Sequence, residues 1–352
     1  MYARGNDGLR RKGRRSCMNI RETMEQWERQ NLSPYASLSS ETLGRDREEP
    51  LCDIRPAYQR DRDRILHSKS FRRLKDKTQV FLAPEGDHYR TRLTHTLEVS
   101  QIARTIARAL RMNESLTEAI ALGHDLGHTP FGHAGEYILN EICEDGFAHY
   151  KQSVRVVEVL EKKGQGLNLT KEVRDGMLNH RTSGNPATLE GKIVRFSDKI
   201  AYINHDIDDA IRGKIITERD IPREYADILG DTVKDRLNIM IHDIINNSMD
   251  KPSIFMSPDV ERAMRGLREW MFEHVYRNPA AKGEEGRAQQ LIVTLYEYYM
   301  KHVDELPEEY LAMMELRGEK RARVVCDYIA GMSDGYAIDR FEELFVPKGW
   351  NV

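Results

Sequence analysis

An apolar repeat at helical spacing constrains this sequence more than any other feature. Over residues 187–211, steps of three or four separate Ile193, Phe196, Ile200, Ile203, Ile207 and Ile211. Such steps place all of these side chains on one face of an α-helix, which other helices must then cover. Similar patterns predict helices over residues 94–112, 114–126, 255–277 and 286–303. Strand signals are thin, and the best of them, Thr78–Leu82, predicts only a short hairpin. We therefore predict an all-α fold.

Breaks in these patterns indicate how the 352 residues are organised. Residues 1–17 carry six basic residues and one acidic one without periodicity, so we expect a disordered basic extension, with a nucleic-acid-binding tail as the alternative. Prolines and a glycine between 250 and 285 suggest a seam. We predict a helical core over residues 18–250 and a C-terminal helical subdomain over residues 251–352.

Composition excludes several classes of protein. The net charge of −3 provides no global polycation to hold nucleic acid. No apolar run approaches the roughly 18–20 residues that span a bilayer, so we expect a cytoplasmic protein without membrane contact. The four widely spaced cysteines predict neither a disulfide framework nor a cysteine zinc site. Any metal would therefore be held by histidines and carboxylates.

One segment concentrates the groups needed for chemistry. Gly123–Glu136 reads GHDLGHTPFGHAGE, with three histidines, an aspartate and a glutamate among glycines that free the backbone to aim them. The adjacent His124 and Asp125 can meet one ion only if further ligands come from other helices. His95 and Asp198 lie in two predicted helices and are the candidates. Two imidazoles and two carboxylates suit Mn, Fe, Mg, Ni or Zn. Taken singly, His95 would be a packing histidine and Asp198 a surface carboxylate.

Two further patterns lie beside these candidate ligands. Asp198, Tyr202 and Asp206 follow at steps of four and share one polar helix face. Arg92 precedes His95 by three residues, and guanidinium groups bind phosphate oxygens in a bidentate manner. There is no glycine-rich phosphate loop, so arginine, lysine and metal would have to hold the phosphates.

These motifs resemble a known family. The pattern of His95, His124-Asp125 and Asp198 is similar to the HD-domain signature of metal-dependent phosphohydrolases. The strings FRRLKDKTQV (71–80), RLTHTLEV (92–99) and HDLGHTPFGH (124–133) resemble the deoxyguanosine triphosphate triphosphohydrolase (dGTPase) family. The resemblance runs from about Ser33 to about Arg219, and the sequence after Arg219 shows no motif. It implies an HD-domain helical core with a C-terminal helical extension.

The resemblance implies that a deoxynucleoside triphosphate is cleaved at its α-phosphorus, which gives deoxynucleoside and inorganic triphosphate. One divalent ion per subunit would be bound, with Mn or Mg favoured for activity. The resemblance also implies a homo-oligomer and, as an open question, a nucleotide activator. The implied metal ligands are His95, His124, Asp125 and Asp198.

The resemblance assigns further roles residue by residue. His128 would be the catalytic histidine near the scissile bond and Glu136 the carboxylate that orients it. His133 would face the phosphates, and His149 would belong to the active-site wall. Substrate contacts would come from Arg92 and Lys199 to phosphate, from Tyr202 to the sugar, where a ribose 2′-hydroxyl would clash, and from Gln79 and Asp206 to the 3′-hydroxyl.

Two alternatives stay open at this point. One is another HD-domain phosphohydrolase, a nucleotidase or a phosphodiesterase. The other is a binding protein, because residues 60–77 carry eight basic residues against three acidic ones and such a stripe could bind single-stranded nucleic acid or an effector nucleotide. A solvated or inter-subunit face is the favoured explanation of the stripe.

Overall fold

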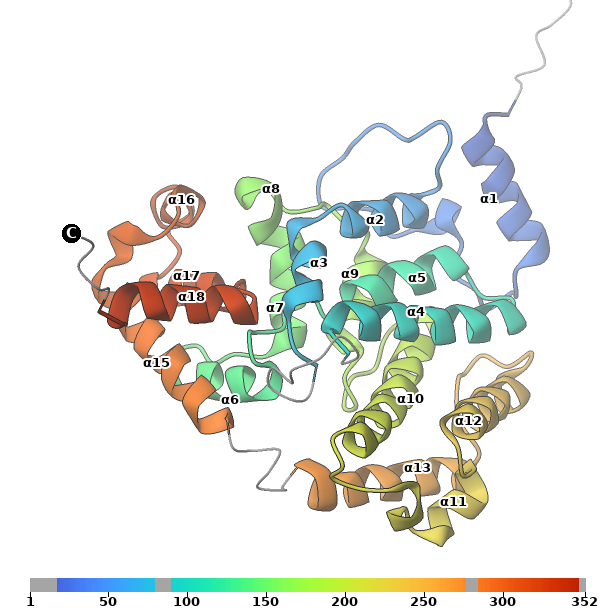
Figure 1. The fold of residues 1–352 in the computed structure, drawn as a ribbon. Helices are drawn as coiled ribbons and strands as arrows, with labels where there is room; N and C mark the ends of the chain where they lie inside the picture. Colours follow the sequence, from blue (N-terminus) through green and yellow to red (C-terminus); the bar gives the residue numbers. More distant parts are fainter. Residues whose placement is uncertain (1–17, 80–89, 277–283, 348–352) are drawn as a thin grey trace, which may run out of the picture.

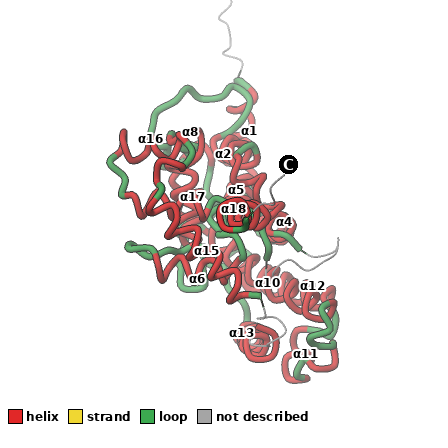
Figure 2. Tube along the Cα trace, turned by 60° about the vertical axis from the view of Figure 1, so that its left-hand side comes forward, coloured by secondary structure: helices red, strands yellow, loops and turns green. Residues whose placement is uncertain are grey.

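The structure is a computed structural model that describes residues 18–79, 90–276 and 284–347. Within these ranges it is built from helices and loops (Figures 1 and 2), which confirms the all-α prediction. The described part of the predicted strand makes a single bridge, between Thr78 and Thr91, and the rest of it lies outside the described residues. The predicted basic extension, residues 1–17, also lies outside them.

The helices follow one another closely along the chain. The α-helices are α1 (Ile20–Asn31), α2 (Ala57–Leu66), α3 (Lys69–Arg73), α4 (Arg92–Ala109), α5 (Glu114–Gly123), α6 (Gly132–Ile142), α7 (His149–Arg155), α8 (Glu161–Gly164), α9 (Lys171–Asn179), α10 (Leu189–Arg212), α11 (Arg223–Leu229), α12 (Val233–Ser248), α13 (Pro258–Met271), α15 (Glu285–Lys301), α16 (Glu308–Arg317), α17 (Arg321–Ala330) and α18 (Asp334–Phe345). Short 3₁₀ turns lie at Ser39–Glu41, Leu74–Asp76, Glu218–Asp220 and Val303–Glu305, and π turns at Val156–Leu160 and Phe272–Tyr276.

The long helix α10 forms where its isoleucine repeat predicts it. The Thr188 side chain caps its first turn by accepting a hydrogen bond from the Gly191 backbone N–H. Ile193, Ile200 and Ile207 are fully buried, because α4, α5 and α9 pack along this helix. Burying the repeat therefore fixes α10 against the two helices that carry the other candidate ligands.

The buried apolar side chains form two clusters. The larger one joins α2–α5 with α9–α13, and the smaller one joins α6 with α15–α18. Figure 1 shows α6 beside α15, away from α10. Helix α13 contributes Val260 and Leu267 to the larger cluster, although both residues follow position 250. The division of the chain at residue 250 stays a prediction.

Buried carboxylates fasten loops to helices at several places. Each accepts a hydrogen bond from a Ser or Thr hydroxyl and another from a backbone N–H of the same or an adjacent residue. Leaving a buried N–H unpaired would cost about 1–3 kcal/mol, so these carboxylates help to fix the segments that they bind. The pairs are Glu28 with Ser39, Asp61 with Thr170, Glu161 with Ser70, Glu172 with Thr42 and Leu43, Glu190 with Ser37, and Asp334 with Thr78.

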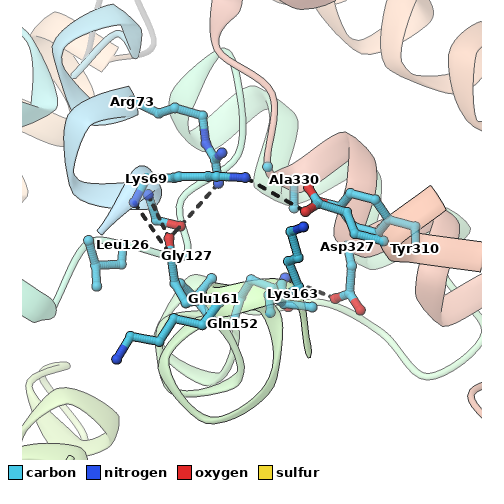
Figure 3. A pocket seen from close by; sticks show the side chains of 16 residues that line it. Lys69, Arg73, Leu126, Gly127, Gln152, Glu161, Lys163, Tyr310, Asp327 and Ala330 are labelled. Atoms are coloured by element: carbon cyan, nitrogen blue, oxygen red, sulfur yellow. Dashed lines mark hydrogen bonds and ion pairs between the residues drawn. The ribbon is translucent and has the colours of Figure 1, made fainter. Parts of the chain in front are cut away.

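A small cavity lies where the two clusters meet. Figure 3 shows its lining, with Lys69, Arg73 and Lys163 across from Tyr310 and Asp327. Its volume is about 30 Å³, which is room for water or a small ion but not for a nucleotide.

None of the helices in the described ranges is long and apolar enough to cross a membrane.

The larger cluster should dominate stability. Leu116→Ala removes a fully buried side chain and should lower the free energy of unfolding by about 2–5 kcal/mol. The matched control is Leu316→Ala, because Leu316 is 83% exposed and its loss should change little. Denaturant titration of both variants checks this, and equal losses would contradict the assigned core.

Candidate active site

Three helices bring the predicted metal ligands together. His95 lies in the first turn of α4, which begins at Arg92 because Thr91 and Thr94 form a reciprocal capping box. His124 and Asp125 follow the end of α5, and Asp198 lies near the middle of α10. The contacts of α4 with α5 and α10 place the three segments side by side.

The turn after Asp125 is fixed by α7. A Cβ atom on Gly127 would lie 2.1 Å from the Ser153 backbone nitrogen, so only glycine allows the two segments to approach this closely. The Ser153 hydroxyl accepts from the Gly127 N–H at 2.9 Å and donates to the His124 carbonyl oxygen at 2.7 Å. The glycine in the motif therefore serves to hold His124 and Asp125 in place.

Ligand atoms of the four candidates approach one another in pairs. His95 Nε2 lies 3.2 Å from Asp198 Oδ1, and His124 Nε2 lies 3.3 Å from Asp125 Oδ1 and 3.7 Å from Asp198 Oδ1. Two ligand atoms at about 2.1 Å from one metal are roughly 3.0–3.4 Å apart. His95, His124 and Asp125 also form a compact group in which each offers one ligand atom.

The hydrogen bonds of His124 fit a metal ligand. Its Nδ1 lies 2.6 Å from the Ala121 carbonyl oxygen, which can only accept, so Nδ1 carries the proton and Nε2 offers its lone pair. His124 Nε2 is buried and has no hydrogen-bond partner among the described residues. A divalent ion would satisfy this atom, so the donor set fits a metal.

The charges in the cluster favour a bound cation. Burial lowers the pKa of His124, but the carboxylates of Asp125 and Asp198 outweigh burial and raise that pKa to about 9. Burial raises the pKa of Asp198, but the neighbouring imidazoles of His124 and His95 outweigh burial and hold it well below its ordinary value. The carboxylates thus attract positive charge to the point where the ligand atoms converge.

Asp125 links the ligand cluster to the rest of the site. Its Oδ1 lies 3.2 Å from His128 Nε2, and its Oδ2 accepts a hydrogen bond from Arg92 at 2.9 Å. Arg92 also donates to the Gln79 carbonyl oxygen at 3.4 Å and is 2% exposed. Arg92, expected to contact phosphate, therefore neutralises a buried carboxylate as well.

The catalytic candidates lie next to one another beside the ligand cluster, and they are His128, His149, Glu136 and His133. The His128 ring stacks on the His149 ring, with centroids 4.0 Å apart and planes 11° apart. The Glu136 carboxylate lies 2.8 Å from His149 Nδ1, so it orients His149, whereas we expected it to orient His128. Asp125, His128 and His149 form a second compact group of ligand atoms. His133 lies at the rim, with its side chain 61% exposed and its Nδ1 3.9 Å from Glu136.

The residues expected at the sugar, and Lys199, expected at phosphate, lie on α10 and on the segment before α4. Gln79 is 4% exposed, and its Oε1 is buried without a hydrogen-bond partner among the described residues. Burial and the Asp209 carboxylate raise the pKa of Asp206 well above its ordinary value. Tyr202 is half-buried against the larger apolar cluster, and Lys199 is half-buried with its ammonium 5.6 Å from the Phe196 ring centroid.

The structure adds two histidines that the sequence analysis missed. His180 is buried, with Nε2 3.3 Å from His149 Nε2 and Nδ1 2.7 Å from the Met177 carbonyl oxygen. His205 Nδ1 lies 3.2 Å from His95 Nδ1, and its Nε2 lies 2.7 Å from Glu98. His205 thus contacts the candidate ligand His95 directly, and the His180 ring lies beside that of His124, with centroids 5.0 Å apart. No spacing rule in the sequence singles these two histidines out.

Several basic residues of the stripe at residues 60–77 form ion pairs with acidic residues of the same chain. Arg62 pairs with Asp63 and Glu118, Arg64 with Glu49, and Lys69 with Glu309. Binding of single-stranded nucleic acid by this stripe stays a prediction.

Two family models and a solved structure match parts of this chain. Residues 92–203 match the HD domain, and residues 254–343 match the phosphohydrolase-associated domain, a match that no motif in the C-terminal sequence had suggested. A solved structure of a hypothetical protein from Aquifex aeolicus is 20% identical, with a TM-score of 0.46 over 82% of this chain and 68% of that chain.

Relatives match over nearly the whole chain. A deoxyguanosinetriphosphate triphosphohydrolase-like protein from Caldanaerobacter subterraneus is 58% identical over 333 residues, which are 95% of this chain and 98% of that relative. Proteins described in the same words are 48% identical in Clostridium perfringens (94% of this chain, 99% of the relative) and 41% identical in Geobacter metallireducens (91% and 96%). This chain therefore belongs to the deoxyguanosinetriphosphate triphosphohydrolase-like family of HD-domain phosphohydrolases.

Proposed function

We propose that this protein hydrolyses deoxynucleoside triphosphates to deoxynucleoside and inorganic triphosphate in a metal-dependent reaction. The observation that carries the proposal is the sharing of Asp125 between the candidate ligand cluster and His128, beside the buried Arg92. A divalent ion there would polarise a phosphoryl oxygen and lower the pKa of a bound water. The names of the relatives support a deoxynucleoside triphosphate as the substrate class.

His95, His124, Asp125 and Asp198 are the proposed ligands of one divalent ion per subunit. A site with two carboxylate and two imidazole donors accepts Mn, Fe, Mg, Ni or Zn, and we propose Mn or Mg for the active protein. Arg92 is proposed to bind phosphate with the part of its guanidinium that Asp125 and Gln79 leave unused, since its Nε is buried without a hydrogen-bond partner among the described residues.

His128, His149 and Glu136 are proposed to take part in proton transfer, and His133 is proposed to interact with phosphate charge. As a water oxygen bonds to the α-phosphorus, the bond from phosphorus to O5′ breaks and O5′ needs a proton. We assign this general acid–base role to His128, which His149 supports by stacking and Glu136 supports through His149. The exposed His133 is placed to contact the outer phosphates.

The substrate end of the site is proposed to read the sugar. Gln79 Oε1, a buried acceptor without a hydrogen-bond partner in the part of the chain that the structure describes, and Asp206 are proposed to bind the 3′-hydroxyl. Tyr202 is proposed to pack against C2′, where a ribose hydroxyl would clash, and Lys199 to bind phosphate. A homo-oligomer, a nucleotide activator and a cytoplasmic location remain proposals from the family resemblance.

Removing single ligands should separate metal binding from folding. Asp198→Ala and Asp125→Ala should both lose bound Mn²⁺ and turnover while keeping their helical circular dichroism. In chelator, Asp125→Ala should also lose about 3–5 kcal/mol of unfolding free energy, because Arg92 then stays buried without its carboxylate. Atomic emission and denaturant titration measure these effects, with the exposed Asp259→Ala as control. Full activity in metal-depleted Asp125→Ala would refute the metal site.

His128→Ala should retain the metal and lose most of kcat, by a factor on the order of 10²–10⁴. His242→Ala is the matched control, because His242 lies exposed on α12 and touches none of the site. Steady-state kinetics with Mn²⁺ tests both variants. A kcat near that of the wild type would remove His128 from the proton-transfer role.

Product analysis tests the reaction itself. Each of the four dNTPs and GTP is incubated with Mn²⁺ or Mg²⁺, singly and as mixtures, and the products are separated by anion exchange. We expect deoxynucleoside and intact triphosphate, with GTP a poor substrate. Monophosphate or orthophosphate as the product would instead indicate a nucleotidase or phosphodiesterase.

A further inference from the structure

We propose that Asp334, far from the HD motifs in the sequence, is a positioning residue for the active site. It is the first residue of α18, lies within the phosphohydrolase-associated match and is 8% exposed. The inference rests on the proposed hydrolase function, and it assigns to the C-terminal region a part in catalysis.

One carboxylate joins two segments that lie more than 50 residues apart. Asp334 Oδ2 accepts hydrogen bonds from the Thr78 backbone N–H at 3.0 Å and from the Thr78 hydroxyl. Asp334 Oδ1 accepts from the Phe131 backbone N–H at 2.9 Å. Each carboxylate oxygen thus binds a different loop, and the carboxylate fixes the distance between the two loops.

Both loops lead directly into the candidate site. Thr78 precedes Gln79, the proposed sugar contact, whose carbonyl oxygen accepts from Arg92. Phe131 precedes α6, the helix that carries His133 and Glu136. Displacing either loop would therefore move groups that contact the substrate or the catalytic histidines.

The backbone conformation of the loop at Phe131 is unfavourable and needs stabilising contacts from other segments. Phe131 has φ +61° and Gly132 has φ +56°, and the left-handed region is unfavourable for a side chain such as phenylalanine. A Cβ on Gly132 would lie 3.3 Å from the Gln79 carbonyl oxygen and 3.5 Å from Arg92. The two loops are thus packed against each other at the point where Asp334 binds both.

A buried lysine makes a second connection to the same region. The Lys77 ammonium donates to the Ala330 carbonyl oxygen at 2.8 Å and to the His128 carbonyl oxygen, and Lys77 is 3% exposed. The end of α17 is therefore linked through Lys77 to the backbone at His128, and the start of α18 binds the backbone at Phe131.

The elements that carry the candidate metal ligands are held mainly by other contacts. The ligands lie on α4, at the end of α5 and on α10, which pack in the larger apolar cluster. Losing Asp334 should consequently impair turnover while leaving metal binding intact.

Glu190 offers a closely matched control. Its carboxylate also accepts three hydrogen bonds, from the Ser37 N–H at 2.9 Å, the Ser37 hydroxyl at 3.0 Å and the Asn113 N–H at 3.0 Å. It too is buried and joins two segments, the loop at Ser37 and the start of α5, but the residues that it binds are not adjacent in sequence to a proposed active-site residue. Glu190→Gln should cost stability without a specific loss of turnover.

The test compares Asp334→Asn with Glu190→Gln in the full-length protein. We measure kcat, KM, bound Mn²⁺ per chain and unfolding free energy. For Asp334→Asn we expect kcat to fall about 10-fold to 100-fold, KM to rise, and Mn²⁺ stoichiometry to stay at the wild-type value. Partial unfolding would instead lower kcat and metal content in the same proportion. A kcat within twofold of the Glu190→Gln value overturns the proposal.

Amide hydrogen exchange gives a readout that does not need activity. In Asp334→Asn the Thr78 and Phe131 amides should exchange faster than in the wild type, and in Glu190→Gln those of Ser37 and Asn113 should do so instead. Thr78→Val, which removes only the hydroxyl bond, should show a smaller kcat loss than Asp334→Asn. Unchanged exchange at Thr78 and Phe131 overturns the proposal.

A failure of the proposed function can be distinguished from a failure of the proposal for Asp334. If the wild type hydrolyses no dNTP, the kinetic comparison is made with Mn²⁺-dependent cleavage of bis(4-nitrophenyl) phosphate, and the amide exchange test stands as it is.

Discussion

A buried carboxylate needs compensating charge, and Asp125 receives it from three sides. Arg92 binds one oxygen, while His124 and His128 approach the other. Burial raises the pKa of Asp125, but His124, His128 and Arg92 outweigh burial and hold it well below its ordinary value. The ligand cluster, the arginine proposed to bind phosphate and the catalytic candidate therefore meet at one ionised group, and the positions of α4 and α5 must satisfy it together.

The sequence predicted the parts of this arrangement that depend on local periodicity and on motif. The isoleucine repeat predicted α10, and the glycine-rich histidine segment predicted a site where a helix ends. The helix predicted for residues 114–126 ends at Gly123, because His124 and the residues after it turn to meet α7. The ligand quartet could be proposed from residue types and family resemblance, but its spacing is a property of tertiary packing.

The contacts that the sequence did not predict are those between distant segments with no repeating pattern. His180 reaches His149 from the end of α9, and Glu136 pairs with His149 and not with His128. Helix α6 follows the histidine segment directly, yet it packs with α15–α18 in the smaller apolar cluster. The catalytic candidates thus lie at the seam between two cores, which explains how a C-terminal region without recognisable motifs makes contact with the site through Lys77 and Asp334.

Hydrolysis of dGTP in ¹⁸O-labelled water with Mn²⁺ tests the central claim most directly. If water attacks the α-phosphorus at the Asp125 site, mass spectrometry should find one ¹⁸O in intact triphosphate and none in deoxyguanosine. Label in the 5′-hydroxyl of deoxyguanosine would place the attack on carbon. Products other than triphosphate, or the same products after removal of the metal, would also contradict the account.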